Sequence, residues 1–298
     1  MNFLSSITRF VYGTTRLGDE SIPLNEKVAT ARYAIESQNW IHTSDQYGSA
    51  ESILKIASHE LGKPLPPVIC KIGWESVSQI REQILHQIEA LGIEKIEIGQ
   101  LCLGGELAEH FREGNSLIES LLTLRSEGIV NRFVLETWPW NSELVMDGLT
   151  HSLAETIIDG LIFYCNPLQR FVSNDLWSFI LENGIPFIAM RTTCGGSLEN
   201  LIHSEKAPVY LQKRAIEMKP IFESSGCGSW PEFCMSFFNS LEHAQATVGS
   251  TSRIGNYQDL KNLSNNVSPL PEESLRDIFA LQIRWAHEHD QFAAPWSM

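Results

Sequence analysis

The sequence predicts a single-domain α/β protein, a closed (β/α)8 TIM barrel with one further helix after its eighth strand. Three observations predict it. Short β-branched runs alternate with longer amphipathic stretches along the whole chain, eight of these runs are strand-like, and the chain has 298 residues. This alternation is typical of parallel βαβ units, and eight of them in roughly 260 residues have the size of a closed barrel. We therefore expect one barrel domain over residues 1–298.

The strands are predicted from runs rich in valine, isoleucine, phenylalanine and threonine. In order they are Phe10–Thr14, Trp40–Ser44, Val68–Ile72, Ile96–Leu103, Arg132–Thr137, Gly160–Cys165, Phe187–Arg191 and Ala246–Ser250.

The helices are predicted from apolar residues repeated every three or four positions. They are Asn25–Ser37, Ala50–Leu61, Val77–Leu91, Asn115–Ser126, Asn141–Leu153, Asp175–Glu182, Trp230–Leu241, Gly255–Leu263 and, after two prolines, Glu272–His289. The stretch Thr192–Ala207 is predicted to be a long loop on the face where barrels carry function.

A doubly wound open sheet is the alternative architecture. It is expected to carry a glycine-rich phosphate loop with the spacing G-x-G-x-x-G after its first strand. The segment Gly13–Gly18 reads GTTRLG and lacks that spacing. The sequence therefore favours the barrel.

Composition excludes several classes of partner. The net charge is −14, which argues against binding to nucleic acid phosphates. No apolar run approaches the 18 residues of a membrane span, and the N-terminus carries no pattern of a secretory signal. The six cysteines show no disulfide-scaffold spacing, so reduced thiols and a cytoplasmic location are expected.

Six short motifs stand in a fixed order along the chain. They are the segments 41–51 (IHTSDQYGSAE), 68–71 (VICK), 91–101 (LGIEKIEIGQL), 124–130 (LRSEGIV), 164–167 (YCNP) and 248–252 (VGSTS). In this order and spacing the chain resembles the aldo-keto reductases. The resemblance covers nearly the whole chain and implies reversible hydride transfer between NADPH or NADH and a small carbonyl compound.

The family has four catalytic residues, a tyrosine, a lysine, an aspartate and a histidine, of which this chain keeps two. Tyr47 and Lys71 stand at the tyrosine and lysine positions. His42 stands at the aspartate position and Cys102 at the histidine position. A phenol has a pKa near 10, so a neighbouring cation is needed to make it an effective acid, and the resemblance assigns that role to the lysine.

The missing aspartate leaves the lysine without its usual counter-ion. Asp45 could replace it only if its loop folds inward. Glu136 could replace it if its side chain points into the barrel mouth, because a cation buried there needs a partner.

The cofactor positions also depart from the family pattern. Glu136 and Thr137 stand where the family has the serine and asparagine that hold the nicotinamide carboxamide, and Ile162 stands where it has glutamine. Further candidates for cofactor binding, at strand ends and in the last helices, are Gly13, Thr14, Arg191, Ser250, Thr251, Arg253 and Asn262. The sequence does not choose between NADP and NAD.

His42 and Cys102 each have two interpretations. A histidine in a strand can be a general base, but it can equally be a hydrogen-bonded core residue. A cysteine beside Lys71 can be a reactive thiolate, but a buried cysteine behaves more often as a small apolar group. A zinc site built from His42, Cys102 and Cys165 is a weaker alternative, since no ligand spacing supports it and no metal is expected.

Two further features suggest a substrate pocket. Trp138 and Trp140 follow the fifth strand and could line the pocket or simply cover the barrel rim. The last residues, 292–298, could close over the mouth as a lid or form an ordering tail.

The sequence leaves two functions open. The first is an NAD(P)H-dependent oxidoreductase that reduces a small carbonyl compound, such as a sugar-type substrate, with Tyr47 as the proton donor. The second is a barrel of the same ancestry that has lost hydride transfer and acts as a binding protein or as a redox-neutral enzyme. The four replaced positions, His42, Cys102, Glu136 and Ile162, motivate the second function.

Overall fold

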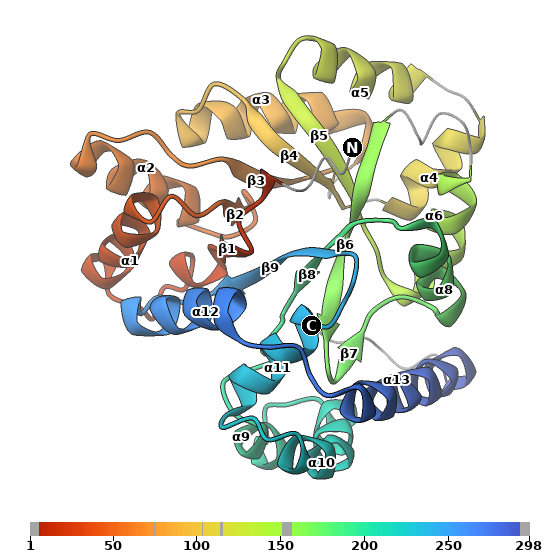
Figure 1. The fold of residues 1–298 in the computed structure, drawn as a ribbon. Helices are drawn as coiled ribbons and strands as arrows, with labels where there is room; N and C mark the ends of the chain where they lie inside the picture. The colour runs from red at the N-terminus through yellow and green to blue at the C-terminus, as the bar shows by residue number, and fades with distance from the viewer. Residues whose placement is uncertain (1–5, 74–75, 103, 114–115, 151–156, 293–298) are drawn as a thin grey trace.

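A computed structural model describes residues 6–73, 76–102, 104–113, 116–150 and 157–292. Its central feature is one sheet with the strand order β5-β4-β3-β2-β1-β9-β8-β6-β7, and a further pairing between β5 and β6 closes it into a barrel (Figure 1). The strands are β1 (Phe10–Gly13), β2 (Ile41–Thr43), β3 (Val68–Ile72), β4 (Ile96–Leu101), β5 (Val130–Glu136), β6 (Ile158–Asn166), β7 (Gln169–Arg170), β8 (Phe187–Met190) and β9 (Ala244–Ser250).

Eight of these strands run parallel, which confirms the predicted barrel and excludes the open sheet. The exception is β7, which turns back antiparallel on β6, with Cys165 opposite Arg170. All parallel strands point their carboxyl ends to one face, so the candidate residues that follow them gather there.

Helices surround the strands on the outside of the barrel (Figure 1). They are α1 (Leu24–Glu36), α2 (Ala50–Leu61), α3 (Ile80–Leu91), α4 (Gly104–Glu113), α5 (Ser116–Ser126), α6 (Ser142–Leu149), α8 (Asn174–Asn183), α9 (Leu198–His203), α10 (Val209–Ser224), α11 (Trp230–Asn239), α12 (Ile254–Asn266) and α13 (Glu272–Phe292). None of the described helices combines the length and the apolar character that a membrane span requires.

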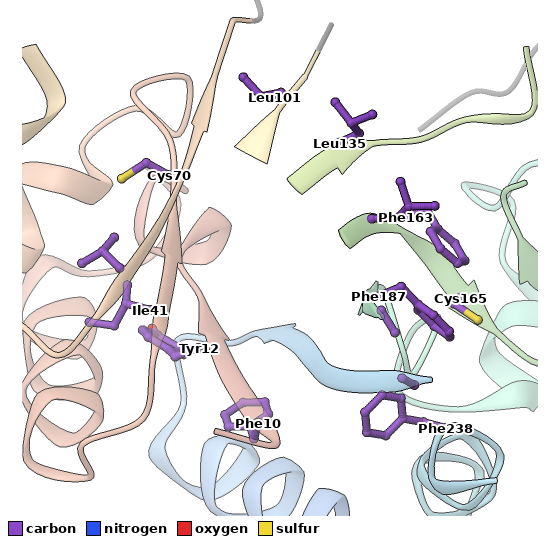
Figure 2. Packing of buried hydrophobic residues seen from close by; sticks show 14 of the residues in the cluster. Phe10, Tyr12, Ile41, Cys70, Leu101, Leu135, Phe163, Cys165, Phe187 and Phe238 are labelled. Atoms are coloured by element: carbon purple, nitrogen blue, oxygen red, sulfur yellow. The ribbon is translucent and has the colours of Figure 1, made fainter. Parts of the chain in front are cut away.

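Each strand contributes to two cores, because successive side chains point to opposite faces. The outer core lies between the strands and the helices, and Figure 2 shows part of it, with Cys70, Leu101 and Phe163 from the strands and Phe238 from α11. The inner core fills the barrel with residues such as Val11, Ile69, Ile98, Val134 and Ile188. The barrel is thus packed below its mouth, and only the layer above these residues can host chemistry.

The structure adds elements that the sequence did not predict. Helix α4 follows β4, the short helix α9 lies inside the predicted loop Thr192–Ala207, and α10 follows that loop. The C-terminal segment 293–298, proposed as a lid, lies outside the described residues, as do the predicted element ends Leu103, Asn115 and Leu153.

Candidate functional site

Tyr47 lies in the loop between β2 and α2, over the mouth of the barrel. The loop packs tightly against the loop after β1, because a Cβ atom on Gly18 would lie 2.0 Å from the backbone oxygen of Tyr47. Only glycine fits at that position. Gly48, with φ of +54°, then turns the chain into α2, a conformation that glycine adopts without strain. The Tyr47 backbone is therefore positioned by the close approach of Gly18 and by the turn at Gly48.

Lys71 lies on β3 and is held in place from the outside of the barrel. Gln87 on α3 donates a hydrogen bond of 2.9 Å to the backbone oxygen of Lys71. One turn earlier, Gln83 accepts a hydrogen bond of 2.7 Å from the backbone of Gly73. These two glutamines fix the end of β3, while the lysine side chain points the other way, into the mouth.

The counter-ion of Lys71 is Glu136, which comes from β5. The distance from Lys71 Nζ to Glu136 Oε1 is 3.6 Å, and the two side chains are only 16% and 4% exposed. The expectation that Glu136 could serve if it pointed inward is therefore confirmed. Asp45 is placed elsewhere, since its charge acts on Glu51 and Cys70.

This environment sets the charges of the pair. Burial by itself would lower the pKa of Lys71, but the charge of Glu136 and the groups around it outweigh that effect and raise the pKa. Burial raises the pKa of Tyr47 to about 12, although the charge of Lys71 acts in the opposite direction. At neutral pH the site therefore holds a protonated lysine next to a protonated phenol.

His42 points into the barrel from β2 and contacts Gln100 on β4. The distance between His42 Nε2 and Gln100 Oε1 is 2.6 Å, and both side chains are buried. Burial lowers the pKa of His42 to about 4, and the charge of Lys71 contributes in the same direction. The imidazole is neutral at pH 7, so the contact is between a ring N–H and an amide oxygen. This geometry favours the interpretation of His42 as a hydrogen-bonded core residue.

Cys102 lies just after β4, close to Lys71 and Glu136. Its thiol lies 3.6 Å from the backbone oxygen of Gln100. Burial raises its pKa well above the ordinary value, and the charge of Glu136 adds to the shift. Because its thiolate is disfavoured in this way, Cys102 is a weak hydrogen-bond donor rather than a nucleophile.

The structure also places Tyr164, which the sequence analysis did not single out, in this layer. It lies on β6 and its side chain is 9% exposed. The Arg191 guanidinium lies 4.6 Å from its ring centroid. Lys71 and Glu136 both act on its charge. The only sequence signal for Tyr164 was its place two residues before Asn166 in the YCNP segment.

A band of aromatic rings leads from Tyr164 to the surface. Trp138 lies 5.0 Å from Tyr164 between ring centroids, and Trp140 stacks on Trp138 at 4.9 Å with an angle of 10°. Trp140 is 60% exposed. The two tryptophans therefore form a wall that starts at the mouth and ends in solvent, which fits the pocket interpretation.

The ends of β8 and β9 form an edge suited to phosphate. Helix α12 begins right after β9, and its N-cap residue Arg253 makes no side-chain hydrogen bond to the first turn. Ser250 accepts a hydrogen bond of 3.0 Å from the backbone of Arg16, and Thr251 accepts one of 3.1 Å from the backbone of Arg253. Arg191, at the end of the neighbouring strand, has φ of +54°, an uncommon conformation for a residue with a side chain.

The remaining candidates have other neighbours. Thr14 is buried and its hydroxyl contacts Thr43 at 2.8 Å. Thr137 is buried, and its hydroxyl donates to the backbone of Leu135 at 3.3 Å. Asn262 lies eight residues into α12, about 12 Å along the helix from its start, and its side chain accepts a hydrogen bond from Asn266.

Gly13 closes β1 at the mouth. A Cβ atom there would lie 3.0 Å from Val248 on β9, so a side chain would be crowded at this point. Gly13 thus lies beside Ser250, its partner in the β1–β9 register. Asn262, inside α12, is not paired with either residue.

A buried carboxyl lies behind the Tyr47 loop. Glu51, in the first turn of α2, is 8% exposed, and its Oε1 atom has no hydrogen-bond partner among the described residues. Burial and the like charge of Asp45 raise its pKa to about 7. Its charged form is therefore disfavoured in the folded protein, and no hydrogen bond or ion pair among the described residues joins it to Lys71 or Glu136.

Among the described residues, no three His, Cys, Asp or Glu side chains are placed to hold a metal ion. A groove of about 820 Å³ lies on the outside of the barrel, between α1 and α2, and its lining includes Leu24, Val28 and Ile56. It lies away from the Lys71–Glu136 pair, so it is not the site described above.

Comparison with known proteins identifies the fold. No protein-family model matches the chain, and no curated protein matches its sequence. Among solved structures it is similar to an aldo-keto reductase from Klebsiella pneumoniae in complex with NADPH, with a TM-score of 0.67 and 13% identity over 93% of this chain and 92% of the other. It is also similar to an aldose reductase from Giardia lamblia, with a TM-score of 0.64 and 14% identity over 93% of each chain. This chain has the aldo-keto reductase fold.

The resemblance predicted from the motifs is therefore confirmed at the level of the fold. Within the aldo-keto reductase fold, Tyr47 and Lys71 occupy the barrel mouth as the motifs predicted, and Glu136 supplies a carboxylate from β5. His42 on β2, at the position for which the motif resemblance implies an aspartate, is neutral.

Proposed function

We propose that the protein is an NAD(P)H-dependent oxidoreductase that reduces a small carbonyl compound at the mouth of the barrel. Tyr47 gives its proton to the carbonyl oxygen. Lys71 stabilises the charge that develops there, and Glu136 holds Lys71 in place. When bound, the cofactor supplies the hydride that the carbonyl carbon receives. A small sugar-type carbonyl compound is within this substrate class.

The observation that carries the proposal is the contact between Lys71 and Glu136. The resemblance to the family implies an aspartate that holds the lysine and a lysine that acts on the tyrosine. This chain lacks that aspartate. A second carboxylate lies 3.6 Å from the lysine instead. The buried cation keeps its counter-ion, so it can stay charged beside Tyr47.

The residues at the β8–β9 edge fit the phosphates of a dinucleotide. Arg191 and Arg253 are both exposed there, on adjacent strand ends. The first turn of α12 has no side-chain cap, and a helix N-terminus with free N–H groups favours anions. Glu136 can accept one amide N–H of a nicotinamide, whereas the amide of Asn166 is occupied by Gln169 and by the backbone of Leu168 and Arg191.

A titration of the full-length protein with NADPH and with NADH tests the proposal. The chain has eight tryptophans, so quenching of their fluorescence is a suitable signal. We expect dissociation constants in the micromolar range for at least one cofactor. The proposal fails if neither cofactor binds at millimolar concentration.

The second candidate is a barrel of the same ancestry without hydride transfer, acting as a binding protein or a redox-neutral enzyme. The replacement of the carboxamide-holding residues by Glu136 and Ile162 favours it, because Ile162 is buried in the inner core and offers no polar group. This candidate would be supported if neither NADPH nor NADH binds while a small carbonyl compound still binds at the mouth.

A further inference from the structure

The mouth of the barrel holds a second phenol besides Tyr47. We propose that Tyr164 is a catalytic residue whose hydroxyl donates a hydrogen bond to the carbonyl oxygen of the substrate. It would supply the second donor that the family takes from its histidine, a position held here by Cys102. This inference rests on the proposed function and adds a residue to its chemistry.

The position of Tyr164 supports the role. In the β6–β8 register it pairs with Met190 at the top of the barrel, one layer above the packed inner core residues Ile162 and Ile188. Lys71 and Glu136 act on the charge of its hydroxyl, and Tyr164 acts in turn on that of Tyr47. The two phenols and the lysine are therefore close enough to influence one another's charge.

The ring of Tyr164 is fixed on two sides. Phe171 stacks on it with ring centroids 5.2 Å apart at 28°, and Trp138 meets it at 5.0 Å and 64°. A ring held in this way keeps its hydroxyl in one place, and a donor that is already oriented loses little entropy in the transition state.

Arg191 completes the arrangement. Its guanidinium lies over the ring at 4.6 Å from the centroid, and its charge lowers the pKa of the Tyr164 phenol against the larger effect of burial, which raises it. A cation beside a phenol favours the phenolate and so makes the O–H group a stronger hydrogen-bond donor. The uncommon backbone conformation of Arg191 is fixed by Asn166, which donates to the Arg191 backbone oxygen at 3.0 Å.

The other donors near the lysine are already engaged. The N–H of His42 is directed at Gln100, at 2.6 Å. The thiol of Cys102 is a weak donor and contacts the Gln100 backbone. Tyr164 is thus the group best placed to share the carbonyl oxygen with Tyr47. In the proposed reduction Tyr47 would transfer its proton to that oxygen while the carbon receives hydride from the bound cofactor, and Tyr164 would keep its own proton.

The test compares the wild type with Tyr164→Phe in the full-length protein. The control is Tyr33→Phe, on the outer helix α1, where the hydroxyl only accepts a hydrogen bond of 3.0 Å from Gln258. Reduction of acetaldehyde, benzaldehyde and glyceraldehyde is measured with saturating cofactor, and cofactor affinity is measured by fluorescence. We expect Tyr164→Phe to lower kcat about 100-fold, as for loss of one oxyanion donor, with cofactor affinity changed less than about twofold.

The outcomes separate this inference from the proposed function. If the wild type reduces carbonyls and Tyr164→Phe has the same kcat, the inference alone is wrong. It is also wrong if the variant loses cofactor affinity as much as it loses rate, since the ring would then only position the cofactor. If the wild type neither binds cofactor nor reduces any of the three aldehydes, the proposed function fails and the inference fails with it.

Discussion

Lys71 and Glu136 meet across the mouth of the barrel, with Nζ and Oε1 3.6 Å apart, although their strands β3 and β5 are separated by β4. Both side chains point inward, so the intervening strand does not block the contact. A carboxylate on β5 thus neutralises a lysine for which the resemblance implies a partner on β2. The counter-ion of Lys71 therefore comes from β5 in this chain.

Glu136→Gln should destabilise the protein at pH 7. The change removes the counter-ion, so burial then dominates and the pKa of Lys71 falls. We expect a loss of about 2 kcal/mol in the free energy of unfolding, measured by urea denaturation. The double variant Lys71→Met with Glu136→Gln should recover most of it, because no unpaired charge remains. An unchanged stability in Glu136→Gln would show that the ion pair does not form.

His42 should make the protein less stable in mild acid. Its folded pKa is about 4, below the unfolded value of 6.5, so the unfolded state binds the proton first. The stability due to this group is fully present above about pH 6.5 and is lost as the pH falls toward 4. Between pH 7 and pH 5 the loss should be about 2 kcal/mol.

His42→Gln should remove this loss, because an amide does not titrate. The measurement is the free energy of unfolding at pH 7 and pH 5, and the control is His59→Gln on the exposed face of α2. The pH dependence of the control should match that of the wild type. A His42→Gln variant with the wild-type pH dependence would mean that His42 is not buried as described.

Glu51 should affect the pH dependence of stability in the direction opposite to His42. Its folded pKa is about 7, above the ordinary 4.5, so the folded state retains the proton longer. The stability from this group is present below about pH 4.5 and is lost as the pH rises through 7. Glu51→Gln should therefore be more stable than the wild type at pH 8, by about 1 to 3 kcal/mol.

The control for that measurement is Glu60→Gln, at an exposed position of the same helix. Glu60 lies 3.3 Å from Arg32 in a surface ion pair, which contributes little. If the two substitutions change the free energy of unfolding at pH 8 equally, the burial of Glu51 would be contradicted.

Arg253→Ala should weaken cofactor binding. A charged hydrogen bond to phosphate contributes about 1.5 to 3 kcal/mol, so the dissociation constant should rise at least about tenfold. Arg81→Ala, on α3 and paired with Glu127 at 2.9 Å, is the matched control and should bind like the wild type. Equal affinities of all three proteins would remove Arg253 from the cofactor site.

Local signals were sufficient to predict the barrel. Each parallel strand is a short apolar run in the sequence, so the predicted bounds of all eight lie within a few residues of the observed ones. Helix α10 was missed because it carries Pro220 in its interior and lacks a clear apolar face. The two-residue strand β7 depends on its antiparallel pairing with β6, which a local pattern does not contain.

The site was less predictable than the fold. Tyr47 and Lys71 lie in motifs that can be read in the sequence, and the mouth brings them together. Tyr164 carries no such signal, because the side chains that surround it, Arg191 and Trp138, come from other strand ends. The neutral state of His42 likewise results from burial against Gln100, a contact across 58 positions of the chain.

The most direct test of the central claim compares carbonyl reduction by the wild type and by Tyr47→Phe, with cofactor affinity measured in parallel. With a pKa of about 12, Tyr47 stays protonated from pH 6 to pH 9, so its titration should not change the wild-type rate in that range. The account predicts that Tyr47→Phe abolishes reduction while cofactor affinity stays within about twofold, since the hydroxyl acts on the substrate. A variant that keeps the wild-type rate would contradict it.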